Sequence, residues 1–196
     1  MELRNNITGE KAIYETRFDI KISEGKLVLD YYAKHSQLFS YSNKFNDDIY
    51  KGDVCEIFID VGVKDHYWEI EVAPNGTVFL ADITNDGKSF SGVRLKENFV
   101  EAKVTLYEHD YDMHIEIPLD KLGYTPEYGI KYNAYRIDTD GGIENAHLFA
   151  LNPTMCGSFH KKEYVKSSSF LQHCHISFPA IFQTFVEVIK KSIIIR

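Results

Sequence analysis

Hydrophobic and polar residues alternate along much of the chain. Between residues 12 and 22 the even positions are mostly apolar and the odd positions are mostly charged. This period of two is typical of a strand with one buried face. The same alternation predicts further strands at residues 26–33, 99–106 and 112–118. Turn signals rich in Gly, Asn and Asp separate the strands at residues 74–76, 85–87 and 140–142.

Helical signals are weak over most of the chain. No long window before residue 170 has apolar residues at helical spacing with recognisable caps, and only residues 118–122 suggest one helical turn. Many short strands with regular turns predict an all-β fold, an antiparallel β-sandwich of jelly-roll type. A length of 196 residues fits one domain. The aromatic content of 14% also favours strands and surfaces that stack on a ligand.

Charge and composition narrow the classes of partner. The net charge of −7 argues against nucleic acid, because the chain as a whole does not supply the excess of basic groups that neutralises phosphates. Apolar stretches are too short for a bilayer span, so no membrane partner is expected. No basic and apolar leader is visible at the N-terminus, which predicts a cytoplasmic location unless a leader was removed. The cysteines lack metal or disulfide spacing and are expected to be thiols: Cys55, Cys156 and Cys174.

Two neighbouring strands place acidic residues on one face. At residues 54–61 the apolar odd positions point to the core and turn Glu56 to the other face. At residues 67–72 the core takes Trp68, Ile70 and Val72, which turns Tyr67, Glu69 and Glu71 outward. The connection between the two strands is short, so the sequence predicts that Glu56, Glu69 and Glu71 share one sheet face. These residues alone leave two interpretations, a solvated outer face or carboxylates that bind sugar hydroxyls or a cation.

Two longer segments resemble a known family. Residues 48–60, Asp-Ile-Tyr-Lys-Gly-Asp-Val-Cys-Glu-Ile-Phe-Ile-Asp, and residues 67–79, Tyr-Trp-Glu-Ile-Glu-Val-Ala-Pro-Asn-Gly-Thr-Val-Phe, resemble the central signature of the family 9 carbohydrate-binding modules. Later segments are similar to the closing strands and late binding loop of that family: residues 132–138, 150–155 and 159–160. The resemblance implies a β-sandwich that takes part in polysaccharide catabolism without being a catalyst. It also implies that the ligand is a small sugar or the end of a β-linked glucan or xylan chain, as in cellulose or xylan.

The resemblance also implies the sugar contacts. In sugar-binding members two aromatic rings clamp the terminal sugar, and Tyr50 and Phe159 stand at those positions. The signature glutamate matches Glu56 and the polar position of the next strand matches Glu69, which implies hydrogen bonds to sugar hydroxyls. The best-known members have tryptophan at both clamp positions. The smaller rings of this chain therefore predict weak binding.

Three further residues keep two interpretations each. Arg136 alternates with its apolar neighbours, which predicts that it faces the carboxylate strands as a sugar contact or as the partner of a structural ion pair. His160 follows the late aromatic residue and is either a third sugar contact or an ordinary surface histidine. For Trp68 the alternation favours the core over a ligand role.

A cation remains a candidate cofactor. Residues 138–141, Asp-Thr-Asp-Gly, are similar to the opening of a calcium loop, but Phe149 stands at loop position twelve and excludes an EF-hand. Some members of the resembled family hold structural calcium. That resemblance implies a structural calcium ion on carboxylates at the edge of the sandwich.

Two functions compete with sugar binding. Common hydrolase, zinc-protease and nucleotide motifs are absent from the sequence, so the enzymatic alternative is a glycoside hydrolase that uses two of Glu56, Glu69 and Glu71. A one-domain sandwich of this length has little chain for a deep cleft, which favours a binding module. The third alternative is a protein-interaction sandwich that has lost sugar binding.

The last part of the chain departs from the family pattern at Val165. We expect a carbohydrate-binding-like sandwich over residues 1–165 and a divergent tail over residues 166–196. Apolar spacing after residue 181 suits a helix, and β-branched residues there suit a strand, so both remain open. Such a tail can dock on the sandwich or mediate a homodimer.

Overall fold

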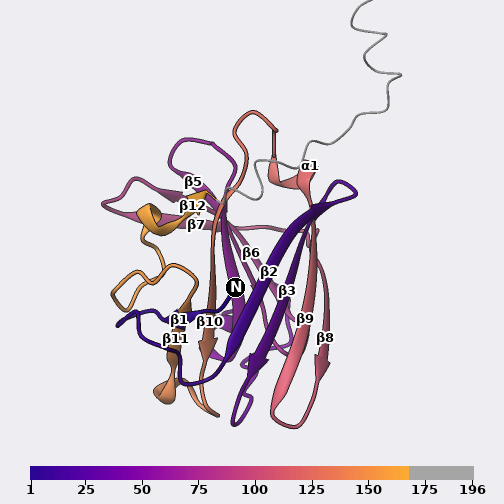
Figure 1. Ribbon diagram of the computed structural model, residues 1–196. Helices are drawn as coiled ribbons and strands as arrows, with labels where there is room; N and C mark the ends of the chain where they lie inside the picture. The colour runs from indigo at the N-terminus through magenta and orange to yellow at the C-terminus, as the bar shows by residue number, and fades with distance from the viewer. Residues whose placement is uncertain (168–196) are drawn as a thin grey trace, which may run out of the picture.

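The computed structural model describes residues 1–167, which form a sandwich of two antiparallel sheets (Figure 1). The smaller sheet has the order β2 (Thr16–Ser23), β3 (Lys26–Lys34), β9 (Asp110–Pro118) and β8 (Glu101–Leu106). The larger sheet has the order β1 (Arg4–Asn5), β11 (His147–Ala150), β10 (Lys131–Asp138), β4 (Val54–Asp60), β5 (His66–Val72), β6 (Val78–Asn85) and β7 (Phe90–Arg94). A short strand, β12 (Lys166–Ser167), also pairs with β10. The predicted all-β sandwich is confirmed.

Helical structure is confined to single turns within the described residues. The predicted turn after β9 forms α1 (Leu119–Leu122), and 3-10 turns occur at Ile49–Lys51, Ile143–Asn145 and Lys162–Tyr164. None of the helices in this part of the chain is long and apolar enough to cross a bilayer.

Glycine closes two of the predicted turns. Gly76 joins β5 to β6 with a φ of 83°, and Gly87 joins β6 to β7 with a φ of 84°. Both angles lie in the left-handed region, which a residue without Cβ adopts at low cost. These tight connections keep β5, β6 and β7 adjacent and antiparallel.

The space between the sheets holds the main core. Cys55, Ile57, Ile59, Ile70 and Val72 are all buried there, as the alternation predicts. Trp68 packs against the same core but is only half-buried, because it lies near the end of the sandwich. Its indole N–H donates a hydrogen bond to the carbonyl oxygen of Leu122 at 3.0 Å.

The outer face of the larger sheet is also buried. A second apolar cluster covers it, formed by residues from the central strands, the turn before β4 and the segment after β11: Ile49, Val54, Phe58, Tyr67, Ala73, Phe79, Ala81, Ile83, Tyr135, Ile137, Ala150, Phe159 and Val165. In Figure 1 the orange segment that follows β11 lies on this side of the molecule. A fully solvated outer face is therefore excluded.

Two of the three cysteines fall within residues 1–167, and both are free thiols, Cys55 in the core and Cys156 near the surface. Burial raises the pKa of the Cys55 thiol to about 11. Cys174, the alternatives for the tail and its proposed role in a homodimer lie outside the described residues.

Candidate functional site

Three glutamates converge on the outer face of the larger sheet. Glu56 on β4 stands directly opposite Glu71 on β5, and Glu69 lies two positions away on the same face. One carboxylate oxygen of each residue lies within 4.8 Å of the others. Their relative exposures are 3%, 8% and 2% in the order Glu56, Glu69 and Glu71. The predicted shared face is confirmed, and we name these residues the carboxylate triad.

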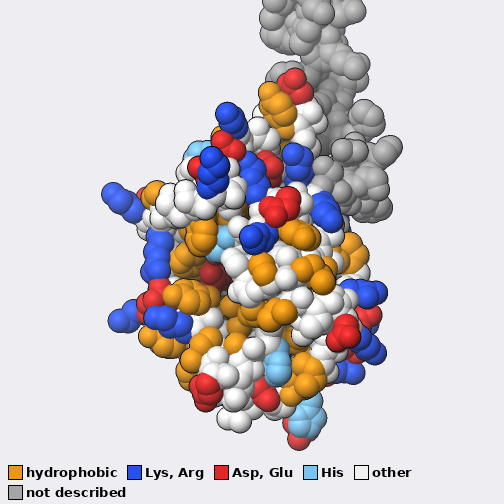
Figure 2. All heavy atoms as spheres, turned by 90° about the vertical axis from the view of Figure 1, so that its left-hand side faces the viewer, with side chains coloured by type: hydrophobic (Ala, Val, Ile, Leu, Met, Phe, Trp, Pro, Cys, Tyr) orange, Lys and Arg blue, Asp and Glu red, His pale blue; other side chains and the backbone are white. Residues whose placement is uncertain are grey.

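The triad forms part of the lining of a groove of about 410 Å³. Figure 2 looks onto this face, where a red carboxylate lies recessed among orange hydrophobic side chains. Aromatic and aliphatic side chains supply most of the remaining walls: Tyr50, Phe79, Phe90, Ile137, Leu148, Phe159 and His160, with Gly157 and Ser158. The groove therefore combines apolar walls with acidic groups, which is typical of small-ligand sites.

Tyr50 enters the groove from the 3-10 turn before β4. Its neighbour Ile49 is 1% exposed and anchors the turn, and the Lys51 ammonium pairs with the Asp48 carboxylate at 2.8 Å. Gly52 follows because a Cβ there would stand 2.5 Å from the carbonyl oxygen of Phe39. The Tyr50 ring itself is 42% exposed. It is therefore available to a ligand.

The late loop is tied to the N-terminal segment by a buried polar cluster. The side-chain amide of Asn6 donates hydrogen bonds to Thr154 Oγ1 and to the Cys156 carbonyl, both at 2.8 Å. Thr154 in turn donates to the Ser158 carbonyl at 2.8 Å. Asn6 and Thr154 are 0% and 4% exposed. Residues some 150 positions apart thus fix the loop that carries Phe159.

Phe159 lines the groove but presents little free surface. It is 8% exposed and stacks on Tyr135, with ring centroids 4.3 Å apart. The Tyr135 hydroxyl also donates to the carbonyl oxygen of Phe159 at 3.3 Å. Of the two predicted clamp rings, Tyr50 is open to a ligand and Phe159 is largely committed to packing.

His160 is held inside the site. Its ring stacks on Phe90 at 3.8 Å between centroids, and its Nδ1 shares a hydrogen bond of 2.7 Å with the Tyr67 hydroxyl. Its Nε2 lies 3.6 Å from a Glu69 carboxylate oxygen. Burial lowers the pKa of the imidazole to about 4, so the ring is neutral at pH 7. An ordinary surface histidine is excluded by these contacts.

Arg136 does not reach the groove, and the prediction that it faces the triad is wrong. It stands on β10 beside Cys55, on the inner face of the sheet, and is 0% exposed. Its guanidinium pairs with the Asp138 carboxylate and donates to Thr16 Oγ1 at 2.8 Å. Tyr135 and Ile137, its neighbours along the strand, face outward instead. Arg136 therefore forms a structural ion pair and is not a sugar contact. Its partner is Asp138 and not a triad carboxylate.

Burial and mutual repulsion hold protons on the triad. Both raise the pKa of Glu56 and Glu71 well above the ordinary range, and burial raises the pKa of Glu69 to about 7. Direct interaction between the Glu56 and Glu69 carboxyls adds to the rise in the pKa of Glu56 and opposes the rise in the pKa of Glu69. Glu71 Oε2 is buried and has no hydrogen-bond partner in the described part of the chain. Within residues 1–167 no Lys or Arg lies in ion-pair contact with the triad.

Comparison with known proteins shows a family for this chain. An extracellular protein of Arthroderma benhamiae is 33% identical over 183 residues, which cover 84% of this chain and 82% of that protein. The chain belongs to the family of this extracellular protein. No protein-family model matches the sequence.

Solved structures show the fold. A Bacteroides uniformis protein described as carbohydrate-binding superposes with a TM-score of 0.70 at 14% identity, over 85% of this chain and 83% of that one. A family 9 carbohydrate-binding module of Caldicellulosiruptor kristjanssonii in complex with cellotriose gives 0.57 at 12% identity, over 84% and 80%. The same organism's module in complex with glucose gives 0.53 at 12%, over 85% and 81%. The resemblance to the family 9 fold is confirmed.

Several residues that line the groove were not predicted as site residues from the sequence. Phe79 alternates with Ala81 and Ile83, so its face is readable once β6 is paired with β5. Ile137 follows in the same way from the outward direction of Tyr135. Phe90 carries no such signal, because it is an exposed residue after a turn. Only its stack on His160, seventy positions along the chain, assigns it to the site.

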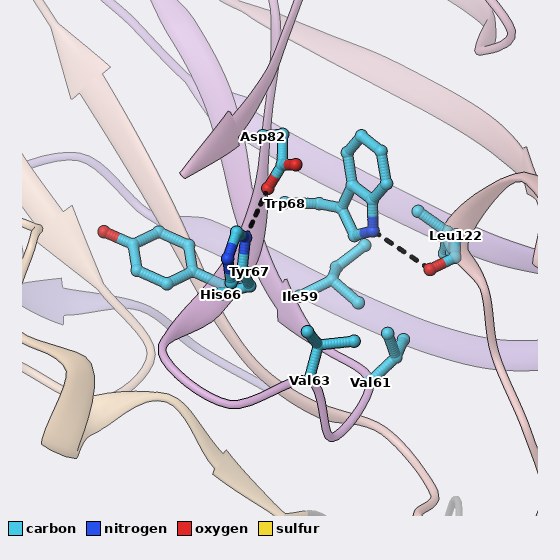
Figure 3. Close-up of a pocket in the computed structure, with 8 residues that line it drawn as sticks. All are labelled: Ile59, Val61, Val63, His66, Tyr67, Trp68, Asp82 and Leu122. Carbon is cyan, nitrogen blue, oxygen red and sulfur yellow. Dashed lines mark hydrogen bonds and ion pairs between the residues drawn. The ribbon is translucent and has the colours of Figure 1, made fainter. Parts of the chain in front are cut away.

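The opposite face of β5 has a second, smaller hollow of about 100 Å³ (Figure 3). His66 Nδ1 lies 3.1 Å from Asp82 Oδ1 there, beside the Trp68 indole. Apolar residues complete its lining: Ile59, Val61, Val63 and Leu122, with Tyr67. It has about a quarter of the volume of the groove.

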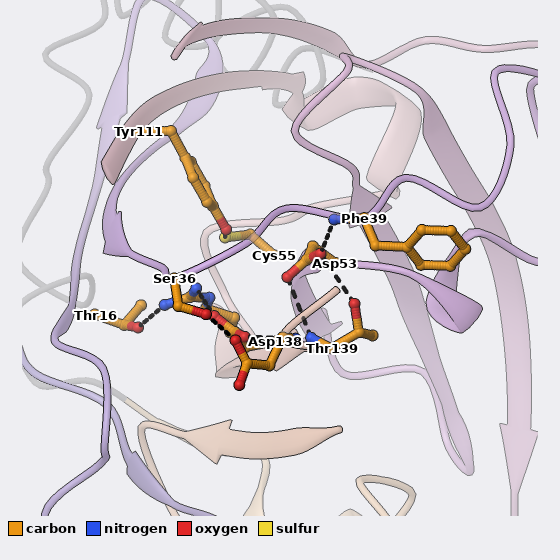
Figure 4. Close-up of polar contacts among 10 residues, drawn as sticks. Thr16, Ser36, Phe39, Asp53, Cys55, Tyr111, Asp138 and Thr139 are labelled. Atoms are coloured by element: carbon orange, nitrogen blue, oxygen red, sulfur yellow. Dashed lines mark hydrogen bonds and ion pairs between the residues drawn. The ribbon is translucent and has the colours of Figure 1, made fainter. Parts of the chain in front are cut away.

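The calcium-loop candidate at residues 138–141 is occupied by internal contacts. Asp138 pairs with Arg136, and Asp140 accepts a hydrogen bond from Ser36 Oγ. Nearby, Asp53 accepts hydrogen bonds from Phe39 N, Thr139 N and Thr139 Oγ1 (Figure 4). These carboxylates do not fit a free cation site. Among the described residues, the carboxylate triad is the one group of three or more with metal-ligand spacing.

Proposed function

We propose that the chain is a non-catalytic carbohydrate-binding module whose groove receives a small sugar or the end of a β-linked glucan or xylan chain. The observation that carries this proposal is the convergence of an exposed tyrosine ring and three carboxyl groups in one groove on a rigid sheet. The family 9 fold supports it, because solved modules of that fold hold cellotriose and glucose.

Each side of the groove has a separate role. The Tyr50 ring stacks on the apolar face of a terminal pyranose, and Glu56 and Glu69 accept hydrogen bonds from its hydroxyl groups. Stacking tolerates many sugars, while the buried carboxyls impose the positions of the hydroxyls. Because one open ring supplies the stacking surface, we expect a dissociation constant of about 0.1 to 1 mM.

A glycoside hydrolase is the second candidate, and one observation favours it. Retaining enzymes separate two carboxyls by about 5 Å, and the triad oxygens, within 4.8 Å of one another, lie close to this spacing. The raised pKa of Glu69, about 7, also suits a general acid. However, such an enzyme needs an ionised nucleophile, whereas burial raises the pKa of Glu56 and Glu71 well above the ordinary range. The binding module accounts better for three carboxyls that retain protons.

Calorimetric titration tests the proposal. Cellobiose, xylobiose and their longer oligomers are titrated into the wild type, into Tyr50→Ala and into Tyr107→Ala. Tyr107 is the matched control, because it is 54% exposed in the turn between β8 and β9, outside the groove. We expect binding to fall about tenfold in Tyr50→Ala and to stay unchanged in Tyr107→Ala. If no sugar binds at millimolar concentration, the proposed function is wrong and only the fold is shared with the family 9 modules.

Hydrolysis is measured with the same oligomers. Release of reducing sugar that Glu56→Gln abolishes would establish the enzyme in place of the module. We expect no release from the wild type, because no ionised carboxyl stands ready as a nucleophile.

A further inference from the structure

The triad is unusual in containing only acidic groups. Buried charges in proteins are normally paired with an opposite charge, because a low-dielectric environment penalises an isolated ion. Here the imidazole of His160, which is neutral, lies 3.6 Å from Glu69, and the Arg94 charge acts on Glu69 and Glu71 without an ion pair to either. Arg94 is engaged by Asp48 and by the carbonyl oxygen of Asn46. Within residues 1–167 no cationic side chain therefore forms an ion pair with the triad.

A second observation is a buried hydrogen-bond acceptor in the triad that lacks a donor. Glu71 is 2% exposed, lines the groove, and its Oε2 has no hydrogen-bond partner among residues 1–167. An unsatisfied buried acceptor costs about 1 to 3 kcal/mol, more when it is charged. A neutral sugar hydroxyl satisfies such an oxygen but leaves the triad carboxyls protonated. A cationic donor satisfies the oxygen and also stabilises the ionised carboxylates.

The spacing of the triad fits one ammonium group. Three N–H bonds at tetrahedral angles, with N···O distances of about 2.8 Å, reach three oxygens that lie about 4.6 Å apart. One oxygen of each triad residue lies within 4.8 Å of the others. An ammonium nitrogen above the triad therefore donates one hydrogen bond to each glutamate.

The walls favour an organic cation over a metal ion. Calcium takes six to eight oxygen ligands, and the triad supplies only three carboxyl groups. The other groove residues are mainly aromatic and aliphatic, with Ser158 as the one hydroxyl side chain besides Tyr50. Aromatic and apolar walls suit the carbon skeleton of an amine ligand, as in other ammonium-binding sites.

From these contacts we infer that the groove selects an amino sugar, in which a protonated amine on the terminal ring takes the place of one hydroxyl. The preferred ligand is then the end of a β-1,4-linked glucosamine chain, with its ammonium on the triad and its ring against Tyr50. This inference rests on the proposed function, since it names the class of sugar for the same groove.

Three dimers that differ only at the second carbon of each ring test the inference. Cellobiose carries a hydroxyl there, the β-1,4 dimer of glucosamine an ammonium, and its diacetylated form a neutral amide. Each is titrated into the wild type by calorimetry at pH 6 in a buffer free of primary amines and at low salt. We expect the glucosamine dimer to bind at least tenfold more tightly than either neutral dimer.

The variants Glu71→Gln and Glu97→Gln locate the effect. Glu71→Gln removes the unpartnered oxygen and is expected to reduce the preference for the amine over cellobiose by about tenfold. Glu97 is an exposed glutamate outside the groove, so Glu97→Gln should keep the full preference. Circular dichroism of each variant confirms that the fold is retained.

The outcomes separate the two proposals. If cellobiose binds as tightly as the glucosamine dimer, the inference is wrong and the binding module stands. If none of the dimers binds, the module itself is wrong and the inference falls with it. Calcium chloride titrated alone is the last arm, and tight binding that Glu71→Gln abolishes would assign the triad to a metal and overturn the inference.

Discussion

Two groups of buried ionisable side chains lie on opposite faces of the same sheet. On the inner face, Arg136 and Asp138 form an ion pair, and backbone and hydroxyl donors satisfy Asp53. On the outer face, the carboxylate triad contains three like groups and one oxygen without a partner. The inner group pairs its cation with a counter-charge and is closed to solvent, which makes it structural, although Arg136 Nε has no hydrogen-bond partner among residues 1–167. The outer group has no cation in ion-pair contact among these residues and opens to a groove, which is why we propose it as a binding site.

The largest expected effect breaks the inner group. Arg136→Leu should lower the free energy of unfolding by about 3 to 5 kcal/mol, because it leaves Asp138 buried without a counter-charge. Urea denaturation measures the loss. Arg17→Leu is the control, since its guanidinium pairs with Glu15 at the surface and should cost less than about 1 kcal/mol. Equal losses in the two variants would contradict a structural role for the inner pair.

The pH dependence of stability should reveal the outer group. The pKa of Glu69 is raised from 4.5 to about 7 on folding, so the folded state binds more protons between these values. Stability therefore falls as pH rises from about 4.5 to 7, by on the order of 3 kcal/mol. Glu69→Gln should remove this contribution and leave the one that the raised pKa values of Glu56 and Glu71 make, whereas Glu97→Gln should retain the whole decline. Urea unfolding at pH 5 and at pH 8 gives the change in stability for each protein. An equal change in wild type and in Glu69→Gln would contradict the raised pKa of Glu69.

The two clamp positions should separate binding from stability. Phe159→Ala is expected to cost about 3 kcal/mol of stability, because the ring is 8% exposed and stacks on Tyr135. Tyr50→Ala should leave stability within about 0.5 kcal/mol and weaken sugar binding about tenfold. Thermal unfolding and calorimetric titration of both variants provide the test. A stable Phe159→Ala protein with impaired binding would make the late ring a true clamp.

The smallest expected effect concerns His160. Its ring is shielded by Phe90 at 3.8 Å, and burial lowers its pKa to about 4. Phe90→Ala exposes the imidazole to water and should raise this pKa toward its ordinary value of 6.5. Titration of the imidazole signals by NMR measures the change. An unaltered pKa would mean that Tyr67 and the late loop alone shield the ring.

Alternation along the chain was sufficient to predict the triad. Side chains in a strand point to opposite faces in turn, and the short connection between β4 and β5 makes them neighbours. Both rules act over a few residues, so they hold without knowledge of the fold. The same rules placed Cys55, Ile57 and Ile70 in the main core.

The same alternation misplaced Arg136, for a physical reason. A charged residue between Tyr135 and Ile137 is expected to point away from the core, since charged side chains are rarely fully buried. That expectation requires a sheet with one buried face, and the larger sheet has two. With apolar residues buried on both sides of β10, the pattern cannot say which face lies between the sheets. The pairing with β4 decides it, because Arg136 stands beside Cys55.

The sequence by itself determined the sandwich, the strands and the common face of the triad, because each follows from contacts between residues close along the chain. The tertiary structure alone decided that this face is buried, that Phe159 packs on Tyr135, and that His160 stacks on Phe90. These contacts join segments that are far apart in sequence. The free energy of such contacts depends on how the late loop folds over the sheet, and no local pattern of residues encodes that arrangement.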